Sequence, residues 1–282
     1  MIIFKHQTDL NKFLQKKSFS GRSIGFVPTM GALHSGHLSL LKKCTKVCQI
    51  TVCSIFVNPT QFNNPDDFKK YPKTVEKDIL ILEENGCDIL FLPDEKEIYP
   101  DEASRKKEYN LGYLETILEG KFRPGHFQGV CQVVEKLLHI VEPDILFLGQ
   151  KDFQQCMVIK RLIEILQADV RLIICPILRE ENGLAMSSRN LRLNATEIQT
   201  AASMHQSLIS IKDNLISTNF VSLKNEAIKS LENKGFRVEY LELATTENLE
   251  LVIDFQNGQS LILLIAAFLN NVRLIDNLLI NP

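Results

Sequence analysis

Two histidines at the start of a predicted helix are the side chains of this sequence best suited to phosphate chemistry. His34 and His37 frame Gly36, and an apolar run that ends at Pro28 predicts a buried strand just before them. A helix N-terminus presents unpaired backbone N–H groups and partial positive charge, so it attracts phosphate. Residues three positions apart share one side of a first turn, and glycine lets a ligand approach the backbone. The pattern therefore predicts a phosphate-binding turn; the alternative is a pair of surface histidines at a helix start.

A second candidate turn, Gly149-Gln150-Lys151-Asp152, also follows an apolar run. Open α/β sheets bind ligands at the carboxyl ends of their strands, so we expect both turns at the same edge of a sheet. Lys151 offers a point charge for phosphate, and Asp152 can accept hydrogen bonds from ribose hydroxyls. Taken alone, the pattern is equally typical of a solvated turn in which Asp152 caps a helix.

Two hydroxyls and a guanidinium stand together in the segment Met186-Ser187-Ser188-Arg189. The planar fork of an arginine beside two hydroxyls makes a compact phosphate clamp. An exposed polar loop is the alternative that the local sequence leaves open.

Two amide side chains, Asn58 and Gln61, follow a third apolar run. An amide both donates and accepts hydrogen bonds, which suits a neutral hydroxyl next to a carboxylate. Further along, Arg123-Pro124-Gly125-His126-Phe127 has the glycine and proline of a shaped loop that leads into a helix. Either segment is also compatible with a plain tight turn.

Five short apolar runs predict the strands that must position these turns. They lack polar alternation, which is typical of strands covered on both faces and hence of a parallel sheet. Amphipathic stretches at 130–141 and 153–166 predict helices between them. The runs lie at 24–27, 50–57, 88–92, 144–148 and 170–175. We therefore expect an α/β fold whose N-terminal domain, residues 1–176, holds a Rossmann-like parallel sheet.

The pattern changes after about Pro176, where a smaller α+β domain, residues 177–282, is expected. Asn194 and Glu197 form the pattern of a capping box at a helix start. Gly235 ends a helix predicted at about 223–234, and Asn270-Asn271 suits a tight hairpin. Strand-like segments lie at 237–243, 261–268 and 272–275.

Composition excludes several classes of protein. Of the 282 residues, 32 are Lys or Arg and 34 are Asp or Glu, a balance that argues against nucleic-acid binding. No run of roughly 18 apolar residues predicts a membrane span, and the first residues lack the pattern of a signal peptide. The seven cysteines contain no C-x-x-C pair, which favours buried, reduced thiols in a cytoplasmic protein.

Six motifs together resemble the pantothenate synthetase family, which belongs to the HxGH-type nucleotidyltransferases. They occur in the family's order and spacing, and six in register are far more specific than one. The motifs are Pro28-Thr29-Met30-Gly31-Ala32-Leu33-His34, Phe56-Val57-Asn58-Pro59-Thr60-Gln61-Phe62, Arg123-Pro124-Gly125-His126-Phe127, Lys151-Asp152-Phe153-Gln154-Gln155, Met186-Ser187-Ser188-Arg189-Asn190 and Arg273-Leu274-Ile275-Asp276-Asn277.

The resemblance implies ATP-dependent condensation of (R)-pantoate with β-alanine through an enzyme-bound pantoyl adenylate, in the biosynthesis of the coenzyme A precursor pantothenate. Diphosphate and AMP would be the other products. It also implies Mg²⁺ and a homodimer. No metal ligand can be named, because Mg²⁺ often sits mainly on phosphates and waters.

The resemblance further implies roles for individual residues. His37 would donate a proton, and His34 and Lys151 would act with it in catalysis. Gln61 and Gln155 would hold pantoate, with Gln61 also near β-alanine. The residues that would bind ATP are Met30, Gly31, Ala32, Leu33, His34, Ser35, Gly36, His37, Gly149, Gln150, Lys151, Asp152, Leu178, Met186, Ser187, Ser188 and Arg189. Among these, Leu178 would contact the adenine through its backbone, and the C-terminal domain would cap the ATP site.

Three positions depart from the family's pattern. Lys73 stands where arginine is common, which exchanges a planar fork for a point charge. Asn182 stands at a position that is often acidic, and Phe268–Asn271 replaces a segment that usually contains glycine. We expect a slightly weaker electrostatic contact from the first and only local changes of loop geometry from the others.

Other functions compete with this interpretation. Another HxGH-type adenylyltransferase would not need Gln61 and Gln155 in a second substrate pocket. A class I aminoacyl-tRNA synthetase is disfavoured by the balanced charge and by the lack of an obvious RNA-binding domain. A nucleotide-sensing module without catalysis would not need the complete set of His34, His37 and Lys151.

Overall fold

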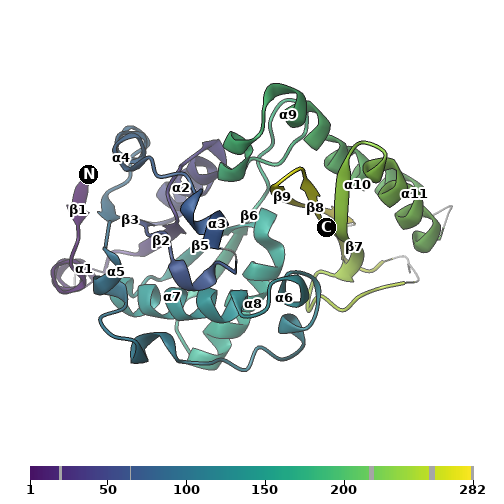
Figure 1. The fold of residues 1–282 in the computed structure, drawn as a ribbon. Coiled ribbons are helices and arrows are strands. Elements are labelled where there is room, and N and C mark those ends of the chain that lie inside the picture. Colours follow the sequence, from purple (N-terminus) through teal and green to yellow (C-terminus); the bar gives the residue numbers. More distant parts are fainter. Residues whose placement is uncertain (19–20, 64, 216–218, 254–257, 281–282) are drawn as a thin grey trace. The chain divides into compact units, whose positions relative to one another are not determined.

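The computed structural model describes residues 1–18, 21–63, 65–215, 219–253 and 258–280. The chain divides into two compact units (Figure 1). The first comprises Met1–Gly149 and Gln155–Pro176, and the second comprises Gln150–Gln154 and Ile177–Pro282. The chain therefore passes from the first unit to the second at Pro176 and also, for five residues, between β5 and the body of α8.

The first unit is built on a six-stranded parallel sheet in the order β1-β4-β3-β2-β5-β6. Helices cover both of its faces (Figure 1), so every residue of β3 is buried. The strands are β1 (Ile2–Phe4), β2 (Ile24–Thr29), β3 (Ile50–Ile55), β4 (Ile89–Phe91), β5 (Ile145–Gly149) and β6 (Arg171–Cys175). The predicted Rossmann-like sheet is confirmed; β1 was not predicted, because it has three residues and lies at an edge with Ile2 and Ile3 exposed.

The sheet has a topological switch point between β2 and β5. From β2 the chain adds β3 and β4 on one side, and later β5 and β6 on the other. The β2–β3 register runs from Ile24↔Ile50 to Thr29↔Ile55, whereas β2 and β5 pair only at Gly25↔Ile145 and Phe26↔Leu146. Ladder pairing between β2 and β5 thus stops before either strand ends. Parallel α/β sheets bind ligands at the carboxyl ends of such strands.

Helix α2 packs closely against β2. A Cβ atom added to Gly25 would lie 2.3 Å from the Cys44 sulfur and 2.7 Å from the Cys48 sulfur, so no side chain fits between strand and helix there. The helices of this unit are α1 (Gln7–Ser18), α2 (Ser35–Val47), α3 (Pro65–Lys69), α4 (Val75–Glu84), α5 (Glu95–Ile98), α6 (Leu118–Phe122), α7 (His126–Val141) and α8 (Phe153–Leu166), with short 3-10 turns η1 (Pro59–Gln61), η2 (Ala103–Arg105) and η3 (Gly112–Glu115). The close packing holds the C-terminal end of α2 against the start of β2.

The second unit packs helices on a three-stranded antiparallel sheet. Nearly all of β8 is buried, and an apolar cluster that includes Leu208, Leu231 and Leu263 fills the core. Its elements are η4 (Gln150–Asp152), η5 (Ser188–Arg192), α9 (Ala195–Ala201), α10 (Ser203–Asn214), α11 (Phe220–Glu232), β7 (Phe236–Thr245), β8 (Leu261–Leu269) and β9 (Val272–Ile280). The predicted α+β character is confirmed.

Local signals in this unit behave as predicted. Asn194 and Glu197 form both hydrogen bonds of a capping box at the start of α9. Asn270, with φ of +50°, turns the chain between β8 and β9, which pair directly at Leu269↔Val272. Asparagine tolerates positive φ, so the pair Asn270-Asn271 forms the hairpin that a glycine would otherwise form.

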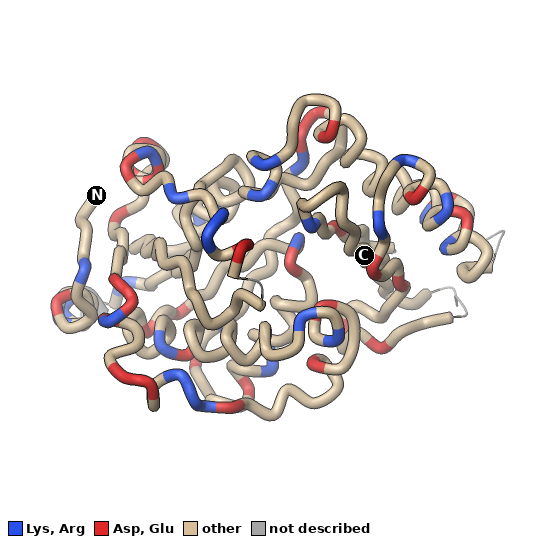
Figure 2. The backbone as a smooth tube through the Cα atoms, viewed as in Figure 1, with Lys and Arg blue, Asp and Glu red and all other residues tan. Residues whose placement is uncertain are grey.

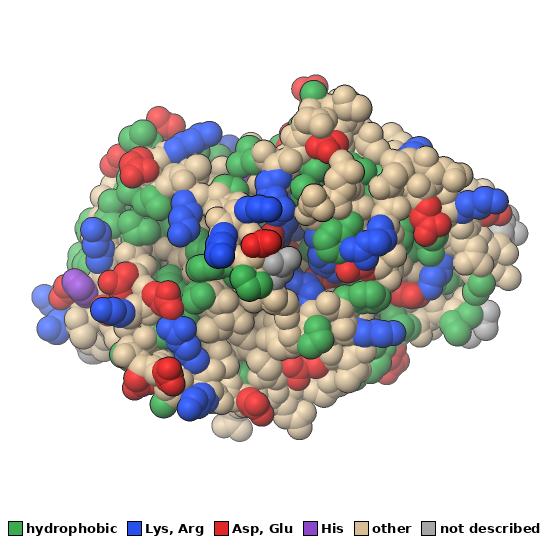
Figure 3. All heavy atoms as spheres, viewed as in Figure 1, with side chains coloured by type: hydrophobic (Ala, Val, Ile, Leu, Met, Phe, Trp, Pro, Cys, Tyr) green, Lys and Arg blue, Asp and Glu red, His purple; other side chains and the backbone are tan. Residues whose placement is uncertain are grey.

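Charge and apolar character agree with the composition. Basic and acidic residues are spread along the backbone of both units (Figure 2), and the face drawn in Figure 3 shows them interspersed. Within the described ranges, no helix combines the length and the apolar character needed to cross a membrane. All seven cysteines are buried and unbridged.

Candidate active site

The predicted phosphate-binding turn begins α2 with both histidines in a capping box. His34 is the N-cap residue, and its Nδ1 accepts from the Gly36 N–H at 3.1 Å. The His37 Nδ1 accepts from the His34 N–H at 3.3 Å, and the two ring centroids lie 4.1 Å apart. A neutral imidazole that accepts at Nδ1 carries its proton on Nε2. The hydrogen bonds therefore set both rings as neutral Nε2–H donors, side by side.

The backbone N–H groups of this turn already have partners. The Gly36 N–H bonds to the His34 ring, and the N–H groups of His37 and Leu38 bond to the His34 carbonyl at 2.9 and 3.2 Å. These hydrogen bonds stabilise the start of α2, and phosphate binding by the N–H groups near Gly36 stays a prediction.

A buried carboxylate holds the chain just before His34. Asp78, on α4, is 1% exposed, and it accepts from the N–H groups of Ala32 at 2.9 Å and Leu33 at 2.8 Å. The Thr74 hydroxyl donates to it at 3.1 Å. Gly31 and Ala32 both have positive φ, +78° and +49°, an unfavourable backbone for alanine. The carboxylate thus stabilises a strained turn that aims His34.

The sequence interpretation missed Asp78. It directly follows the charged residues Glu76 and Lys77, so it resembled a solvated helix residue. A signal was present, because Asp78 shares the apolar stripe of α4 with Val75, Ile79 and Leu82. A carboxylate on such a stripe must find hydrogen-bond donors inside the protein.

Gln61 reaches from the turn after β3 to the turn after β2. Its amide Nε2 donates to the Met30 sulfur at 3.0 Å, and its Oε1 accepts from the Asn58 amide at 3.1 Å. Asn58 is 1% exposed and also binds the Gly129 carbonyl and the Tyr99 hydroxyl. Asn58 is therefore saturated within the protein, which corrects our expectation that it reads a substrate hydroxyl together with Gln61.

The Arg123–Phe127 motif contacts the backbone of Gln61. The Arg123 guanidinium, which can only donate, lies 3.0 Å from His126 Nε2, so His126 carries its proton on Nδ1 and donates it to the Gln61 carbonyl at 2.7 Å. A Cβ atom at Gly129 would lie 2.4 Å from the Thr60 carbonyl oxygen. The first turns of α7 therefore pack directly on the backbone of η1.

Gln155 lies in the first turn of α8, which follows β5, the strand beside β2. Gly149 ends β5, and its carbonyl accepts from the Cys156 thiol at 3.4 Å. Both residues belong to the carboxyl edge of the sheet, on the β5 side of the switch point. Within the first unit, His34 thus contacts His37, and Gln61 contacts Met30. Gln155 lies on α8, the helix that follows the neighbouring strand β5.

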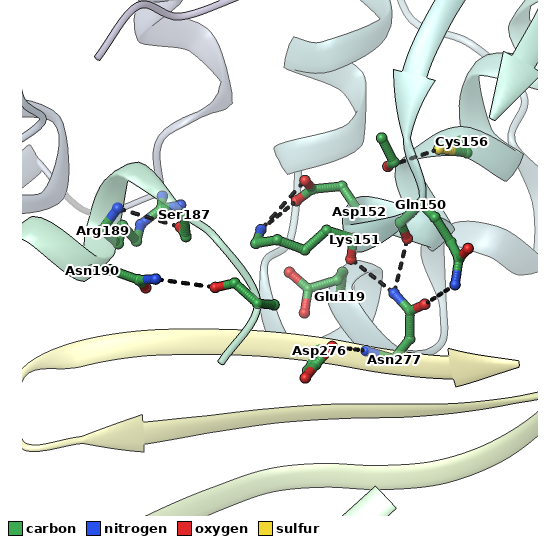
Figure 4. Close-up of polar contacts among 12 residues, drawn as sticks. Glu119, Gln150, Lys151, Asp152, Cys156, Ser187, Arg189, Asn190, Asp276 and Asn277 are labelled. Carbon is green, nitrogen blue, oxygen red and sulfur yellow. Dashed lines mark hydrogen bonds and ion pairs between the residues drawn. The ribbon is translucent and has the colours of Figure 1, made fainter. Parts of the chain in front are cut away.

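The turn that contains Lys151 is fixed by Asn277 of β9 (Figure 4). The Asn277 amide donates to the carbonyls of Gln150 at 2.8 Å and Lys151 at 3.0 Å, and it accepts from the Gln150 amide at 2.9 Å. The Lys151 ammonium lies 3.4 Å from the Asp152 carboxylate. Asp152 is half-exposed, so its charge is open to solvent.

Leu178 and the Met186–Arg189 segment form one hairpin-like loop of the second unit. The Met186 N–H donates to the Leu178 carbonyl at 3.0 Å. The Ser187 hydroxyl accepts from the Arg189 N–H at 3.3 Å and so caps η5, while Ser188 is buried. The structure thus joins the predicted adenine and phosphate segments of this unit in a single loop.

The three departures have local roles. The Lys73 ammonium lies over the Phe68 ring, 5.9 Å from its centroid, a cation–π arrangement that an arginine would also make. Asn182 accepts from the Leu184 N–H and donates to the Ile198 carbonyl, so it fixes a turn. Asn270 makes the β8–β9 turn by its positive φ.

Comparison with known proteins agrees with these motifs. The family model described as pantoate–β-alanine ligase matches residues 2–279. A pantothenate synthetase of Cytophaga hutchinsonii is 46% identical over 283 residues, with 99% of each chain covered. The crystal structure of pantothenate synthetase from Thermus thermophilus is 34% identical, with a TM-score of 0.90 and 99% of each chain covered.

A third similar protein carries ligands. The pantoate–β-alanine ligase of Francisella tularensis, crystallised as a complex with β,γ-ATP and β-alanine, is 39% identical, with a TM-score of 0.83 over 99% of this chain and 97% of that one. The family match spans the six motifs and both units, as do these similarities. This chain belongs to the pantoate–β-alanine ligase family.

Proposed function

We propose that this enzyme uses ATP to join (R)-pantoate to β-alanine through a pantoyl adenylate, forming pantothenate, AMP and diphosphate. The observation that carries the proposal is the pair of Nε2–H donors at His34 and His37, set at the carboxyl end of β2 beside the switch point. Membership of the family supplies the substrate class. The ligand pair in the Francisella protein, β,γ-ATP and β-alanine, has the chemistry that this reaction needs.

In the first half-reaction, a pantoate carboxylate oxygen attacks the α-phosphorus of ATP and diphosphate leaves. Two anions must meet, so positioning and charge neutralisation dominate the barrier. His34 and His37 donate hydrogen bonds from their neutral rings to phosphate oxygens, and His37, which keeps its Nε2 proton, is our candidate for the hydrogen-bond donor to the leaving diphosphate. Lys151 and Arg189 supply the positive charge that the histidines do not. The full set of ATP-binding residues predicted from the sequence is retained in this proposal.

Pantoate binding is assigned to Gln61 and Gln155. The Gln61 amide is oriented by Asn58 and Met30, and its backbone by His126, so little side-chain entropy is lost when it binds a ligand. Gln155 projects from the first turn of α8 on the other side of the switch point. Two amides match the hydroxyl groups of pantoate, which need donors and acceptors together.

In the second half-reaction, the neutral amine of β-alanine attacks the carbonyl of the adenylate, and AMP leaves. AMP is a good leaving group, so orientation and the exclusion of water matter more than a strong base. We propose that residues 1–176 bind nucleotide and pantoate and that residues 177–282 cap the ATP site through the loop of Leu178 and Arg189. The homodimer and the cytoplasmic location implied by the family resemblance complete the proposal.

The donor set fits Mg²⁺ carried by the nucleotide. Among the described residues, no group of three or more His, Cys, Asp or Glu side chains could hold a metal ion. Mg²⁺ commonly keeps several waters and takes one or two carboxylates plus substrate phosphates. Asp152, half-exposed beside Lys151, is the carboxylate we propose for this role. When bound, the ion would neutralise phosphate charge.

Product analysis tests the function directly. Enzyme with ATP and Mg²⁺ is supplied with pantoate alone, β-alanine alone or both, and nucleotide products are separated by chromatography. We expect sustained AMP formation only with both substrates. Sustained ADP formation would indicate activation by phosphorylation, and the absence of any product from well-folded enzyme would favour a nucleotide-binding module.

A further inference from the structure

The last motif of the sequence analysis, Arg273–Asn277, has no part in the function described so far. It ends in two buried polar residues of β9, Asp276 at 5% and Asn277 at 1% exposure. Successive strand residues point to opposite faces. Asp276 therefore shares the face of Val272 and Leu274, which belong to the apolar core, and Asn277 points the other way. Two adjacent buried polar groups on opposite faces need two separate sets of partners.

Asn277 finds its partners in the turn of Lys151. One side chain makes three hydrogen bonds to two consecutive residues that lie 126 and 127 positions away in the chain. Both backbone carbonyls of Gln150 and Lys151 are bound by the same amide nitrogen (Figure 4). Fixing two successive carbonyls fixes the peptide planes on either side of the Lys151 Cα. The direction in which the Lys151 side chain leaves the backbone is thereby set.

Asp276 finds its partner in the loop of Leu178. Arg179 binds it with both guanidinium nitrogens, at 2.7 and 3.0 Å, and also donates to the carbonyls of Gly183 and Asn277. A bidentate pair of this kind is geometrically specific. The loop that carries Leu178 and Met186 is therefore bound to the same point of β9 as the turn that carries Lys151. Three predicted ATP-binding segments of the second unit are thus held by one pair of residues.

We propose that Asn277 is a positioning residue, which acts on ATP through Lys151 by holding the Gln150–Lys151 backbone. The proposal rests on the proposed function, since it takes Lys151 as a phosphate-binding residue. Only an amide fits the contacts, because aspartate cannot donate to two carbonyls and an apolar side chain would leave them unsatisfied. A misplacement of about 1 Å can cost on the order of 10²-fold in rate.

A double-mutant cycle tests this role. The variants Asn277→Ala, Lys151→Ala and the double variant are compared with wild type for kcat/KM in pantoate-dependent exchange of diphosphate into ATP, and for ATP affinity by calorimetry. We expect Asn277→Ala to lower kcat/KM on the order of 10²-fold in the wild-type background and to have almost no further effect once Lys151 is gone. Residues that act as a unit show this non-additivity.

Controls separate positioning from general loss of structure. Glu239→Gln removes an ion pair with Arg273 of the same motif, at 2.7 Å, without touching the Lys151 turn, and it should keep kcat/KM within about twofold of wild type. Should Asn277→Ala not fold, Gln150→Ala takes its place in the cycle, because it removes the side-chain part of the same contact. An equal fold-loss in both backgrounds, for exchange and for ATP affinity, would overturn the proposal.

The two proposals fail differently. Wild-type enzyme without pantoate-dependent exchange would reject the proposed function, and the calorimetric cycle would still decide whether Asn277 acts on nucleotide through Lys151. Full exchange activity in Lys151→Ala, with wild-type ATP affinity, would overturn the positioning role while leaving the ligase function intact.

Discussion

The turn after β2 and the turn after β5 are each held by one buried side chain from elsewhere in the sequence. In the first turn this side chain binds backbone N–H groups, and in the second it binds backbone carbonyls. Asp78 accepts from the N–H groups of Ala32 and Leu33. Asn277 donates to the carbonyls of Gln150 and Lys151. In the first turn the holder is an anion that occupies N–H groups, and in the second it is a neutral amide that occupies carbonyls.

In the proposed function, this difference leaves phosphate binding to side chains in both places. Asp78 occupies the N–H groups of Ala32 and Leu33, so we propose that the donors come from the rings of His34 and His37. In the second turn, Asn277 occupies the two carbonyl oxygens, and Lys151 is the residue that we propose as the source of positive charge. A fixed backbone with functional side chains is a preorganised arrangement, which costs little reorganisation during reaction.

Removing a ring donor should give the largest effect. His37→Gln keeps an N3 side chain that can accept from the N-cap N–H, as glutamine does in a capping box, but it loses the imidazole. We expect turnover to fall by on the order of 10²–10³, with thermal stability close to wild type. Steady-state AMP release and thermal melting measure the two effects.

His37→Ala is the matched variant. It also removes the N3 acceptor of the capping box, a hydrogen bond worth about 1 kcal/mol of stability, so it should be as inactive as His37→Gln and less stable. Near-wild-type turnover in the glutamine variant would mean that His37 serves only as the N3 acceptor of the capping box.

Loss of the carboxylate clamp should come next. Asp78→Asn replaces one acceptor with a donor opposite a backbone N–H, which should cost roughly 1–3 kcal/mol of stability and misplace His34, lowering kcat by about 10-fold or more. Asp88→Asn is the control, since Asp88 accepts from the Thr51 N–H at 2.8 Å at the other end of the sheet. Asp88→Asn should lose stability without losing kcat. Equal losses of kcat in both variants would contradict a specific role of Asp78 in positioning His34.

Replacement of Gln61 should weaken the binding of pantoate more than the binding of ATP. In Gln61→Ala, loss of a hydrogen bond to a charged group would cost about 1.5–3 kcal/mol, and we expect it in the KM for pantoate with ATP affinity nearly unchanged. Titrations with each substrate separately distinguish the two. Weakened ATP binding with normal pantoate binding would move Gln61 to the nucleotide site.

The buried thiols should have the smallest effect on activity. Burial raises the pKa of Cys44, against Gly25 in the β2–α2 contact, from its ordinary 9.0 to about 12, and it does the same for Cys87. Because the folded pKa is raised, the protonated thiols favour the folded state fully below pH 9, and this contribution falls as the pH rises from 9 towards 12. Urea unfolding at about pH 8 and about pH 10.5 should show the loss. Rapid thiol labelling of folded enzyme at the lower pH would contradict it.

Much of the fold was predictable because its signals are local. The strands appear as apolar runs of the right length, and the helix starts at His34 and Asn194 have local capping patterns. The exposed edge strand β1 has no such pattern and was missed. The roles of the two holders were not predictable for a different reason: Asp78 lies 46 residues from Ala32 and Asn277 lies 126 residues from Lys151, so only the folded chain shows what they bind.

The candidate site likewise has features that the sequence predicted and features that only the structure shows. Residue types at His34, His37, Gln61 and Lys151 indicated phosphate and hydroxyl-acid chemistry before any geometry was known. Proton positions depend on hydrogen bonds that no spacing encodes, so the neutral Nε2–H form of the histidines came from the structure. Asn58 and Gln61 both offer an amide in the sequence. Only the structure shows that the Asn58 amide is buried and that its hydrogen-bond donors and acceptor are occupied within the protein.

Pantoate-dependent exchange of labelled diphosphate into ATP, measured in the absence of β-alanine, is the most direct test of the account. The adenylate mechanism predicts exchange and a burst of diphosphate that stops near one equivalent per active site, because the sheltered mixed anhydride waits for the amine. Addition of β-alanine should then restart turnover and yield AMP. Well-folded enzyme that forms pantothenate with both substrates present, yet shows neither exchange nor a burst with pantoate alone, would contradict the adenylate mechanism.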